Sequence, residues 1–115
     1  MSPKFGDIVL ASGGTYSSKP RPVLVFQNDL LSTGDSTVVI PFTSERNPAI
    51  PYRVEVRPTD LNGLDRQCWL EIDKVAAIRT SWLAQTVGAL DIESQNKTLA
   101  LSRRLMSPED HSMTQ

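Results

Sequence analysis

The sequence predicts a mainly β fold, in which a small barrel or curled sheet is capped by one C-terminal helix. Two observations lead to this prediction. Residues 5–88 alternate short runs of β-favouring residues with turn signals rich in glycine, proline, asparagine and aspartate. Residues 92–106 have the spacing and the boundary residues of a single helix. Many short strands followed by one helix are typical of a small barrel with a helical cap.

The central strand is the clearest element of the sequence. Residues 23–26 are all apolar, with no polar alternation, so both faces of this strand are expected to be covered by protein. Pro22 has no backbone N–H, which a strand tolerates at its start, and the strand is therefore expected to begin at Arg21. A guanidinium held where a rigid strand opens to solvent is well placed to bind an anion such as phosphate. The alternative is an arginine that makes only a surface salt bridge.

The segment before the central strand is expected to be a loop. A first strand is expected over residues 5–11, and the glycine- and serine-rich residues 12–19 follow it. These small residues lead directly to Arg21 and are typical of a mobile flap. The single aromatic residue, Tyr16, is a candidate for stacking on a base of a ligand, the alternative being a plain connector.

The strand expected over residues 36–42 forms a hairpin with the central strand. A turn centred near position 32 makes the numbers of facing residues sum to about 64, which places Val25 beside Val39. Four residues further along each strand, Arg21 faces Thr43. Directly opposed residues of antiparallel strands project to the same face, so these two side chains are expected to meet.

Two further strands carry candidate polar residues. Residues 52–57 alternate, with Val54 and Val56 inward and Arg53 on a solvated face, the alternative being that Arg53 lines a groove. In residues 68–73 the apolar positions are Cys68, Leu70 and Ile72. Glu71 and Asp73 then share the other face, where two partly buried carboxylates would shift each other's pKa and act as acid–base or groove residues. The alternative is a surface salt-bridge network with Lys74 and Arg79.

The end of the chain predicts one helix. Residues 75–78 and 86–88 are expected to be strands, with a short helical turn over 81–84 between them. Asp91 is a suitable N-cap for a helix that begins at Ile92 and ends near Met106, before Pro108. Ile92, Leu99 and Met106 recur near helical spacing and are expected to pack inward.

Length and charge limit the possible functions. The 115 residues fit one domain, 1–115, whose last residues, 107–115, are expected to form a frayed tail. The 12 basic residues are balanced by 13 acidic residues, which does not favour broad electrostatic capture of duplex nucleic acid. A short single strand held in a local pocket remains compatible with this balance. There is no apolar run near the ~18 residues of a membrane span and no hydrophobic signal region in residues 1–7, so a cytoplasmic protein is expected.

No cofactor or metal site is expected. Cys68 and His111 are the single cysteine and the single histidine, so the chain has no pair for an internal disulfide and too few ligands for a zinc site. A histidine-based hydrolase is also not expected. The sequence contains neither a phosphate-binding loop nor a dinucleotide glycine motif.

Several segments occur in the order typical of one family. They are Gly-Asp-Ile-Val at residues 6–9, Arg-Pro-Val-Leu-Val at 21–25 with Gln-Asn-Asp at 27–29, Val-Ile-Pro-Phe-Thr-Ser at 39–44, Gly-Leu at 63–64, and Asp-Lys-Val at 73–75 through Ile78. Together they resemble the MazF/PemK toxins of bacterial type II toxin–antitoxin systems, over residues 5 to about 105. The resemblance implies an SH3-like barrel of the CcdB/MazF type in a cytoplasmic homodimer. It also implies a metal-independent endoribonuclease that is held in check by an antitoxin and reaches operator DNA only through it.

The resemblance also implies residue roles. Members of this family cut single-stranded RNA such as mRNA at short sequences, through attack of a 2′-hydroxyl on the adjacent phosphate. By resemblance, Arg21 is the catalytic arginine of the Arg-Pro motif and Thr43 is its partner threonine. The remaining RNA-binding candidates are Lys19, Ser44, Tyr16, Arg53 and Gln27.

The chain departs from the family at one position of interest. One branch of the family uses an arginine and an aspartate two residues apart on the later strand. Asp73 fits the aspartate position, but Glu71 stands where the arginine would be. The acid–base roles of that branch therefore do not carry over, and the general base remains open. The flap is also shorter than in many members.

Two alternatives belong to other functional classes. A CcdB-like gyrase poison has the same fold and acts by binding a protein, but it depends on a C-terminal Trp-Gly-Ile, whereas this chain ends in Asp-His-Ser-Met-Thr-Gln. A catalytically inactive barrel that binds only antitoxin or RNA is the other alternative, which Glu71 and the short flap keep open.

Overall fold

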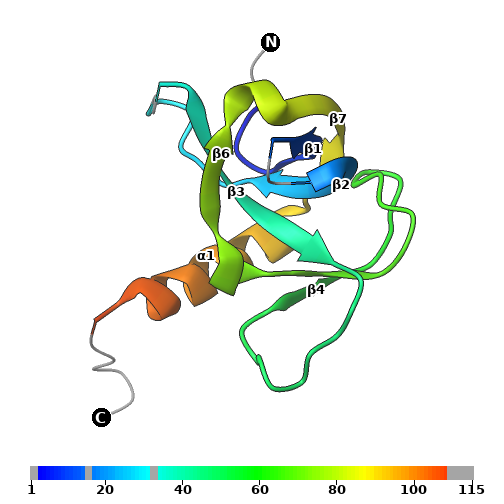
Figure 1. Cartoon of the computed structure of the whole chain (residues 1–115). Coiled ribbons are helices and arrows are strands. Elements are labelled where there is room, and N and C mark those ends of the chain that lie inside the picture. Colours follow the sequence, from blue (N-terminus) through cyan, green and yellow to red (C-terminus); the bar gives the residue numbers. More distant parts are fainter. Residues whose placement is uncertain (1–2, 15–16, 32–33, 109–115) are drawn as a thin grey trace.

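The computed structural model of this chain describes residues 3–14, 17–31 and 34–108, and within them it has a curled antiparallel sheet and one C-terminal helix (Figure 1). The elements are β1 (Asp7–Gly13), β2 (Ser17–Val25), β3 (Ser36–Thr43), β4 (Val54–Val56), β5 (Cys68–Leu70), the 3₁₀ turn η1 (Ile72–Lys74), β6 (Ala76–Arg79), the 3₁₀ turn η2 (Thr80–Trp82), β7 (Leu83–Ala89) and α1 (Ile92–Met106). The predicted mainly β fold with a C-terminal helix is therefore confirmed.

Strand β3 is the hub of the sheet. The strand order is β4-β5-β3-β2-β1-β7, and β6 pairs with β3 outside this order. One edge of β3 pairs with β2, while its other edge pairs first with β6 and then, at its end, with β5. This change of partner along one edge separates β5 from β6 and curls the sheet around the core.

The buried strand β2 packs on both of its faces, as predicted. Leu24 lies in the larger apolar cluster together with Ile8 and Ile40, and Val23 lies in a smaller cluster on the opposite face together with Val39. The alternation of side chains along a strand explains how neighbouring residues reach two different clusters. Residues 23–25 are therefore covered from both sides.

The expected loop over residues 12–19 is wrong, because much of it is strand. β1 continues to Gly13 and β2 already begins at Ser17, with Gly13 opposite Ser17 and Ala11 opposite Arg21. Glycine, serine and proline are turn signals, but pairing with β1 keeps this segment extended. The pairing with β3, in contrast, covers only residues 23–25. The tip of the hairpin, with Tyr16, lies outside the described residues.

Two of the later strands are shorter than expected. Only Val54–Val56 of residues 52–57 form β4, with both valines buried as predicted. Strand β5 ends at Leu70, and the chain then turns through η1 instead of continuing extended. The helical turn near Trp82 is confirmed as η2.

Helix α1 has the predicted boundaries. The side chain of Asp91 accepts a hydrogen bond of 3.0 Å from the Ser94 N–H, and the helix ends at Met106, two residues before Pro108. The helix lies below the sheet and contacts β4 and η1 (Figure 1). None of the helices in the described residues is long and apolar enough to cross a membrane.

The predicted inward stripe of α1 is wrong at both of its ends, while Leu99 between them is partly buried. Ile92 is 69% exposed and Met106 is 60% exposed, whereas Thr98 and Ser102 are buried. The hydroxyls of Thr98 and Ser102 donate to helix carbonyls, at 2.8 and 2.9 Å, so their polar groups are satisfied inside the protein. Leu101 supplies the apolar contact with the core. Apolar spacing alone could not identify a buried face that consists largely of small hydroxyl residues.

Candidate active site

Five of the sequence-predicted site residues line one groove, with a cavity volume of about 830 Å³. They are Lys19, Arg21, Thr43, Ser44 and Glu71. Strand β2 supplies the two cations, the end of β3 supplies the two hydroxyls, and the residue after β5 supplies the carboxylate. We call this cavity the Arg21 groove.

The register of β2 and β3 explains why Arg21 and Thr43 line the same groove. The predicted pairing of Val25 with Val39 is confirmed, and two further pairs, ending at Val23 and Pro41, keep the same sum of residue numbers. Extended by two residues beyond the last observed pair, the same register would bring Arg21 opposite Thr43, on one face. The hairpin arithmetic therefore agrees with the placement of both residues in one cavity.

The cation of Arg21 is not neutralised by the rest of the site. Arg21 is exposed, and within the described parts of the chain its side chain makes no hydrogen bond or ion pair. The Thr43 Oγ1 accepts a hydrogen bond of 3.2 Å from the Glu45 N–H, which leaves the hydroxyl proton able to donate to another group. A guanidinium and a hydroxyl held in this way can bind the oxygens of one phosphate group.

The groove also contains charged residues that the sequence analysis did not assign to the site. They are Lys74, Arg66, Asp65 and Glu45, contributed by η1 and by the loops next to β5 and β3. Two of these cations have acidic neighbours, since Arg66 pairs with Asp65 and Lys74 pairs with Glu71. No local sequence signal connects the loop at residues 64–66 with the start of β2, because the contact arises only when the sheet curls.

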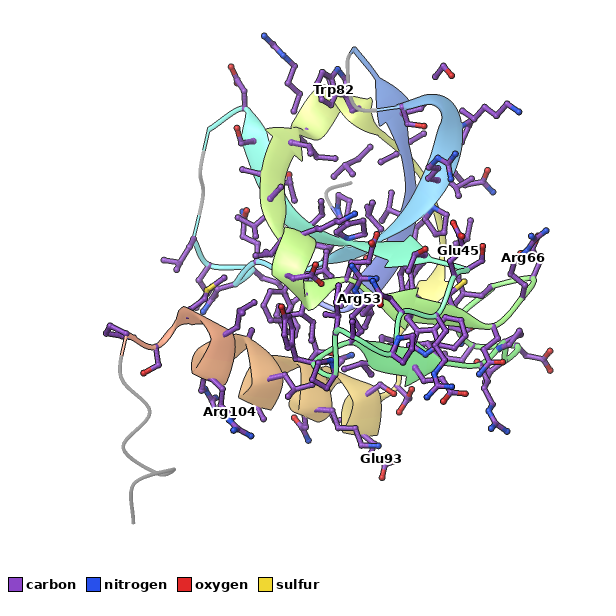
Figure 2. All side chains as sticks on the ribbon, turned by 60° about the horizontal axis from the view of Figure 1, so that its bottom comes forward. Glu45, Arg53, Arg66, Trp82, Glu93 and Arg104 are labelled. Atoms are coloured by element: carbon purple, nitrogen blue, oxygen red, sulfur yellow. The ribbon has the colours of Figure 1, made fainter. Side chains whose placement is uncertain are left out.

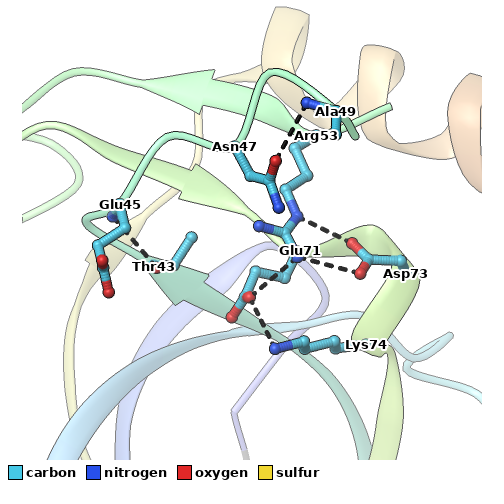
Figure 3. Close-up of polar contacts among 8 residues, drawn as sticks. All are labelled: Thr43, Glu45, Asn47, Ala49, Arg53, Glu71, Asp73 and Lys74. Carbon is cyan, nitrogen blue, oxygen red and sulfur yellow. Dashed lines mark hydrogen bonds and ion pairs between the residues drawn. The ribbon is translucent and has the colours of Figure 1, made fainter. Parts of the chain in front are cut away.

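Arg53 is not on a solvated face, contrary to our expectation. Its side chain is only 9% exposed, and its guanidinium donates to Asp73 twice, at 3.0 and 3.1 Å (Figure 3). The Nη2 atom also lies 3.3 Å from Oε2 of Glu71. Figure 2 shows Arg53 among packed side chains, while Arg66 projects from the edge of the molecule. The carboxylates of Glu71 and Asp73 pair with an arginine that the strand pattern alone would expose.

The ion pair with Arg53 perturbs the acidity of Asp73. The hydrogen bonds from Arg53 lower the pKa of Asp73, although partial burial acts in the opposite direction. The same contact with Asp73 raises the pKa of Arg53. Neither residue lines the Arg21 groove. The expected partner Arg79 is not part of this network, in which the carboxylates pair with Arg53 and Lys74.

Gln27 lies at the other end of β2, outside the Arg21 groove. Its Oε1 accepts a hydrogen bond of 2.9 Å from the Val38 N–H, and its Nε2 donates to the Leu31 carbonyl at 3.0 Å. The side chain therefore links the two arms of the β2–β3 hairpin. It lines a separate cavity of about 420 Å³ near residues 28–31.

Comparison with a family model and with a related sequence identifies the relatives of this chain. Residues 4–105 match the model of the PemK-like, MazF-like toxin of type II toxin–antitoxin systems. A protein of Mycolicibacterium smegmatis described as a probable endoribonuclease MazF is 41% identical over 86 residues. That match covers 74% of this chain and 79% of the relative.

Solved structures with the same fold come from the same group of proteins. An endoribonuclease in complex with its cognate antitoxin, from a mycobacterial species, has a TM-score of 0.75 and 20% identity, covering 95% of this chain and all of that chain. A MazE–MazF structure from Deinococcus radiodurans has a TM-score of 0.76 and 16% identity, covering 95% and 99% of the two chains. The Mycobacterium tuberculosis toxin MazF-mt6 has a TM-score of 0.70 and 21% identity, covering 85% and 93%. On its family match and its sequence relative, this chain belongs to the PemK-like, MazF-like toxins of type II toxin–antitoxin systems, the family of the MazF endoribonucleases.

Proposed function

We propose that this MazF-like endoribonuclease toxin cuts single-stranded RNA in the Arg21 groove, at short sequences and without a metal ion. The observation that carries this proposal is the presence of Arg21 and Thr43 in one groove, each two residues beyond the last β2–β3 pair, Val23 with Pro41. Arg21 has no acidic partner there, so its charge is available to a phosphate.

The chemistry follows from the charge that develops at phosphorus. The 2′-oxygen of the RNA attacks the adjacent phosphorus, and the bond from phosphorus to the 5′-oxygen breaks, which leaves a 2′,3′-cyclic phosphate and a 5′-hydroxyl. The intermediate carries extra negative charge on its non-bridging oxygens. Arg21 donates two hydrogen bonds to these oxygens and Thr43 donates one, and such preorganised donors stabilise the developing charge.

The remaining polar residues of the groove bind the RNA on either side of the cut. Lys19 and Ser44 contact phosphates next to the scissile one, and Tyr16 remains our candidate for stacking on a base. Gln27 and Arg53 are already engaged within the protein, so we assign them to supporting the hairpin and η1. A groove with mixed charges does not attract duplexes broadly, and a short single strand is the substrate that fits it.

The family context supports a set of partners. One related structure is an endoribonuclease in complex with its cognate antitoxin and another is a MazE–MazF structure. We therefore propose that this chain binds an antitoxin, which occupies the Arg21 groove and blocks RNA. We also propose a cytoplasmic homodimer that reaches operator DNA only through the antitoxin.

The test is cleavage of a long RNA of mixed sequence in EDTA by the wild-type protein and by Arg21→Ala. We expect discrete cuts that end in 2′,3′-cyclic phosphate, lost in Arg21→Ala and retained in Arg57→Ala, an exposed arginine outside the groove. Intact RNA in the presence of folded wild-type protein would contradict the proposal. A gyrase-inhibition assay would then test the CcdB-like alternative, and RNA or antitoxin binding without cleavage would indicate an inactive barrel.

A further inference from the structure

The proposed reaction requires a group that accepts the proton of the 2′-hydroxyl. Arg21 is always charged and Thr43 has only a neutral hydroxyl, so neither is a suitable base. The groove contains three carboxylates, those of Glu45, Asp65 and Glu71. The assignment of the proton acceptor to one of these three carboxylates rests on the proposed function.

Strand register places Glu71 beside Thr43. Thr43 faces Trp69 across β3 and β5, and the Glu71 N–H donates to the Pro41 carbonyl at 2.9 Å. Pro41 and Glu71 are therefore opposed in the same register, which sets Thr43 and Glu71 as diagonal neighbours. Such neighbours have Cα atoms roughly 7–8 Å apart on one face, within reach of a long side chain. Arg21 lines the same groove as Thr43 and Glu71.

The carboxylate of Glu71 is held in place through one of its two oxygens. Oε2 lies 3.3 Å from Nη2 of Arg53 and 3.3 Å from Nζ of Lys74. The side chain is only 11% exposed. Both of these contacts end on Oε2, and Oε1 makes no hydrogen bond with any residue that the structure describes. Glu71 therefore presents one oxygen from a fixed position on the wall of the groove.

Asp73 does not offer an equivalent oxygen. Arg53 occupies both of its carboxylate oxygens, at 3.0 and 3.1 Å. Figure 3 shows Glu71 on the Thr43 side of the Arg53 guanidinium and Asp73 on the opposite side. The hydrogen bonds from Arg53 also lower the pKa of Asp73. The aspartate that fits the pattern of one family branch is therefore sequestered here.

The other two carboxylates of the groove are less well placed. Glu45 and Asp65 are exposed residues on loops, and Asp65 is next to the cation of Arg66 at 3.6 Å. Neither side chain is fixed by a buried partner. The other charged groups that surround Glu71 are Lys19, Arg21, Arg53, Arg66 and Lys74, all cations at neutral pH, together with the Asp73 carboxylate described above.

We propose that Oε1 of Glu71 accepts the proton of the attacking 2′-hydroxyl, while Arg53 and Lys74 hold the carboxylate in position. The O–H bond breaks, its electron pair forms the bond from the 2′-oxygen to phosphorus, and the proton passes to Oε1. The bond from phosphorus to the 5′-oxygen then breaks, and the leaving oxygen keeps that electron pair and takes a proton from water. Glu71 returns its proton to the hydroxide that remains, so no oxidant, reductant or metal is needed.

The test compares single-turnover cleavage by the wild-type protein and by Glu71→Gln across pH, in EDTA. Loss of a general base lowers the rate by roughly 10²–10⁴-fold, and we expect a loss of this size. The wild-type rate should fall as acid protonates the base, and this acid limb should disappear in Glu71→Gln. Binding of an RNA with 2′-deoxyribose at the cut position should remain within about twofold or become tighter, because the substitution removes a negative charge from the groove.

Two further variants separate this role from a structural one. Glu71→Gly should be restored in part by added formate, which supplies a carboxylate, whereas Arg21→Ala should not. Asp73→Asn should lower stability but keep the acid limb. A Glu71→Gln protein that cleaves at the wild-type rate would overturn the proposal. If it did so at different RNA sequences, Glu71 would instead recognise a nucleobase. Failure of the wild-type protein itself to cleave RNA would instead refute the proposed function.

Discussion

The buried Arg53 gives a quantitative prediction for stability. Arg53→Met keeps a long apolar stem but removes both hydrogen bonds to Asp73. Each charge-assisted bond contributes roughly 1.5–3 kcal/mol, and removing one partner of a buried pair costs about 3–5 kcal/mol. The Asp73 side chain is 18% exposed and is partly rehydrated in the variant, which favours the lower end of that range. We therefore expect a loss of about 3 kcal/mol in the free energy of unfolding at pH 7.

The assay is urea unfolding followed by circular dichroism. Repeating it across pH tests whether the stability difference depends on the ionised carboxylate of Asp73. The pKa of Asp73 is lowered in the folded protein, so its stabilisation is present above the unfolded pKa of about 3.9 and is lost as pH falls through the folded value. The difference between wild type and Arg53→Met should shrink accordingly below about pH 4. The wild type, Arg53→Met, Asp73→Asn and the double variant form a double-mutant cycle. Additive losses in that cycle, or a difference independent of acid, would refute the reasoning.

Two other substitutions test the local structure. Asp91→Ala removes the N-cap of α1 and should cost about 1 kcal/mol at pH 7. Partial burial opposes ionisation of Asp91, but the hydrogen bond from Ser94 lowers its pKa. The loss of stability in Asp91→Ala should therefore also become smaller in acid. An equal loss at pH 2.5 would contradict the assignment of Asp91 as the N-cap. Gly63→Ala should cost about 1–3 kcal/mol in urea unfolding, because Gly63 has a φ of +68° and an added Cβ would meet the Val87 carbonyl oxygen. An unchanged midpoint would show that the turn at Gly63 relaxes without cost.

Much of the fold was predictable because its signals are local. The apolar run before Gln27, the turn near position 32 and the N-cap at Asp91 identified β2, the β2–β3 hairpin and α1. The register of that hairpin followed from turn position alone, and the pairing of Val25 with Val39 confirms it. The start of β2 and the buried face of α1 were not predictable in the same way. Pairing with β1 extends the start of β2, and hydroxyl residues that bond within the helix form the buried face of α1.

In the candidate site, too, some residues were predictable from local sequence signals and others were not. Sequence pattern and hairpin arithmetic brought Arg21, Thr43 and Ser44 together, because these residues lie on or next to two strands that are consecutive in the sequence. The environments of Arg53 and Glu71 required the tertiary structure, since they depend on the distance between segments 18 residues or more apart in the chain. Alternation along residues 52–57 made Arg53 appear solvated, whereas Glu71 and Asp73 pair with it.

By itself, the sequence determined the pairing of β2 with β3, the boundaries of α1 and the family to which this toxin belongs. These depend on contacts between neighbouring segments and on short motifs. Only the tertiary structure decided which carboxylate faces the groove. The pairing of β5 with β3 sets Glu71 beside Thr43, and Arg53 holds Asp73 away from it. Glu71 and Asp73 are chemically similar side chains, and they differ here because of where Arg53 lies in space. Their spacing along the chain does not contain that information.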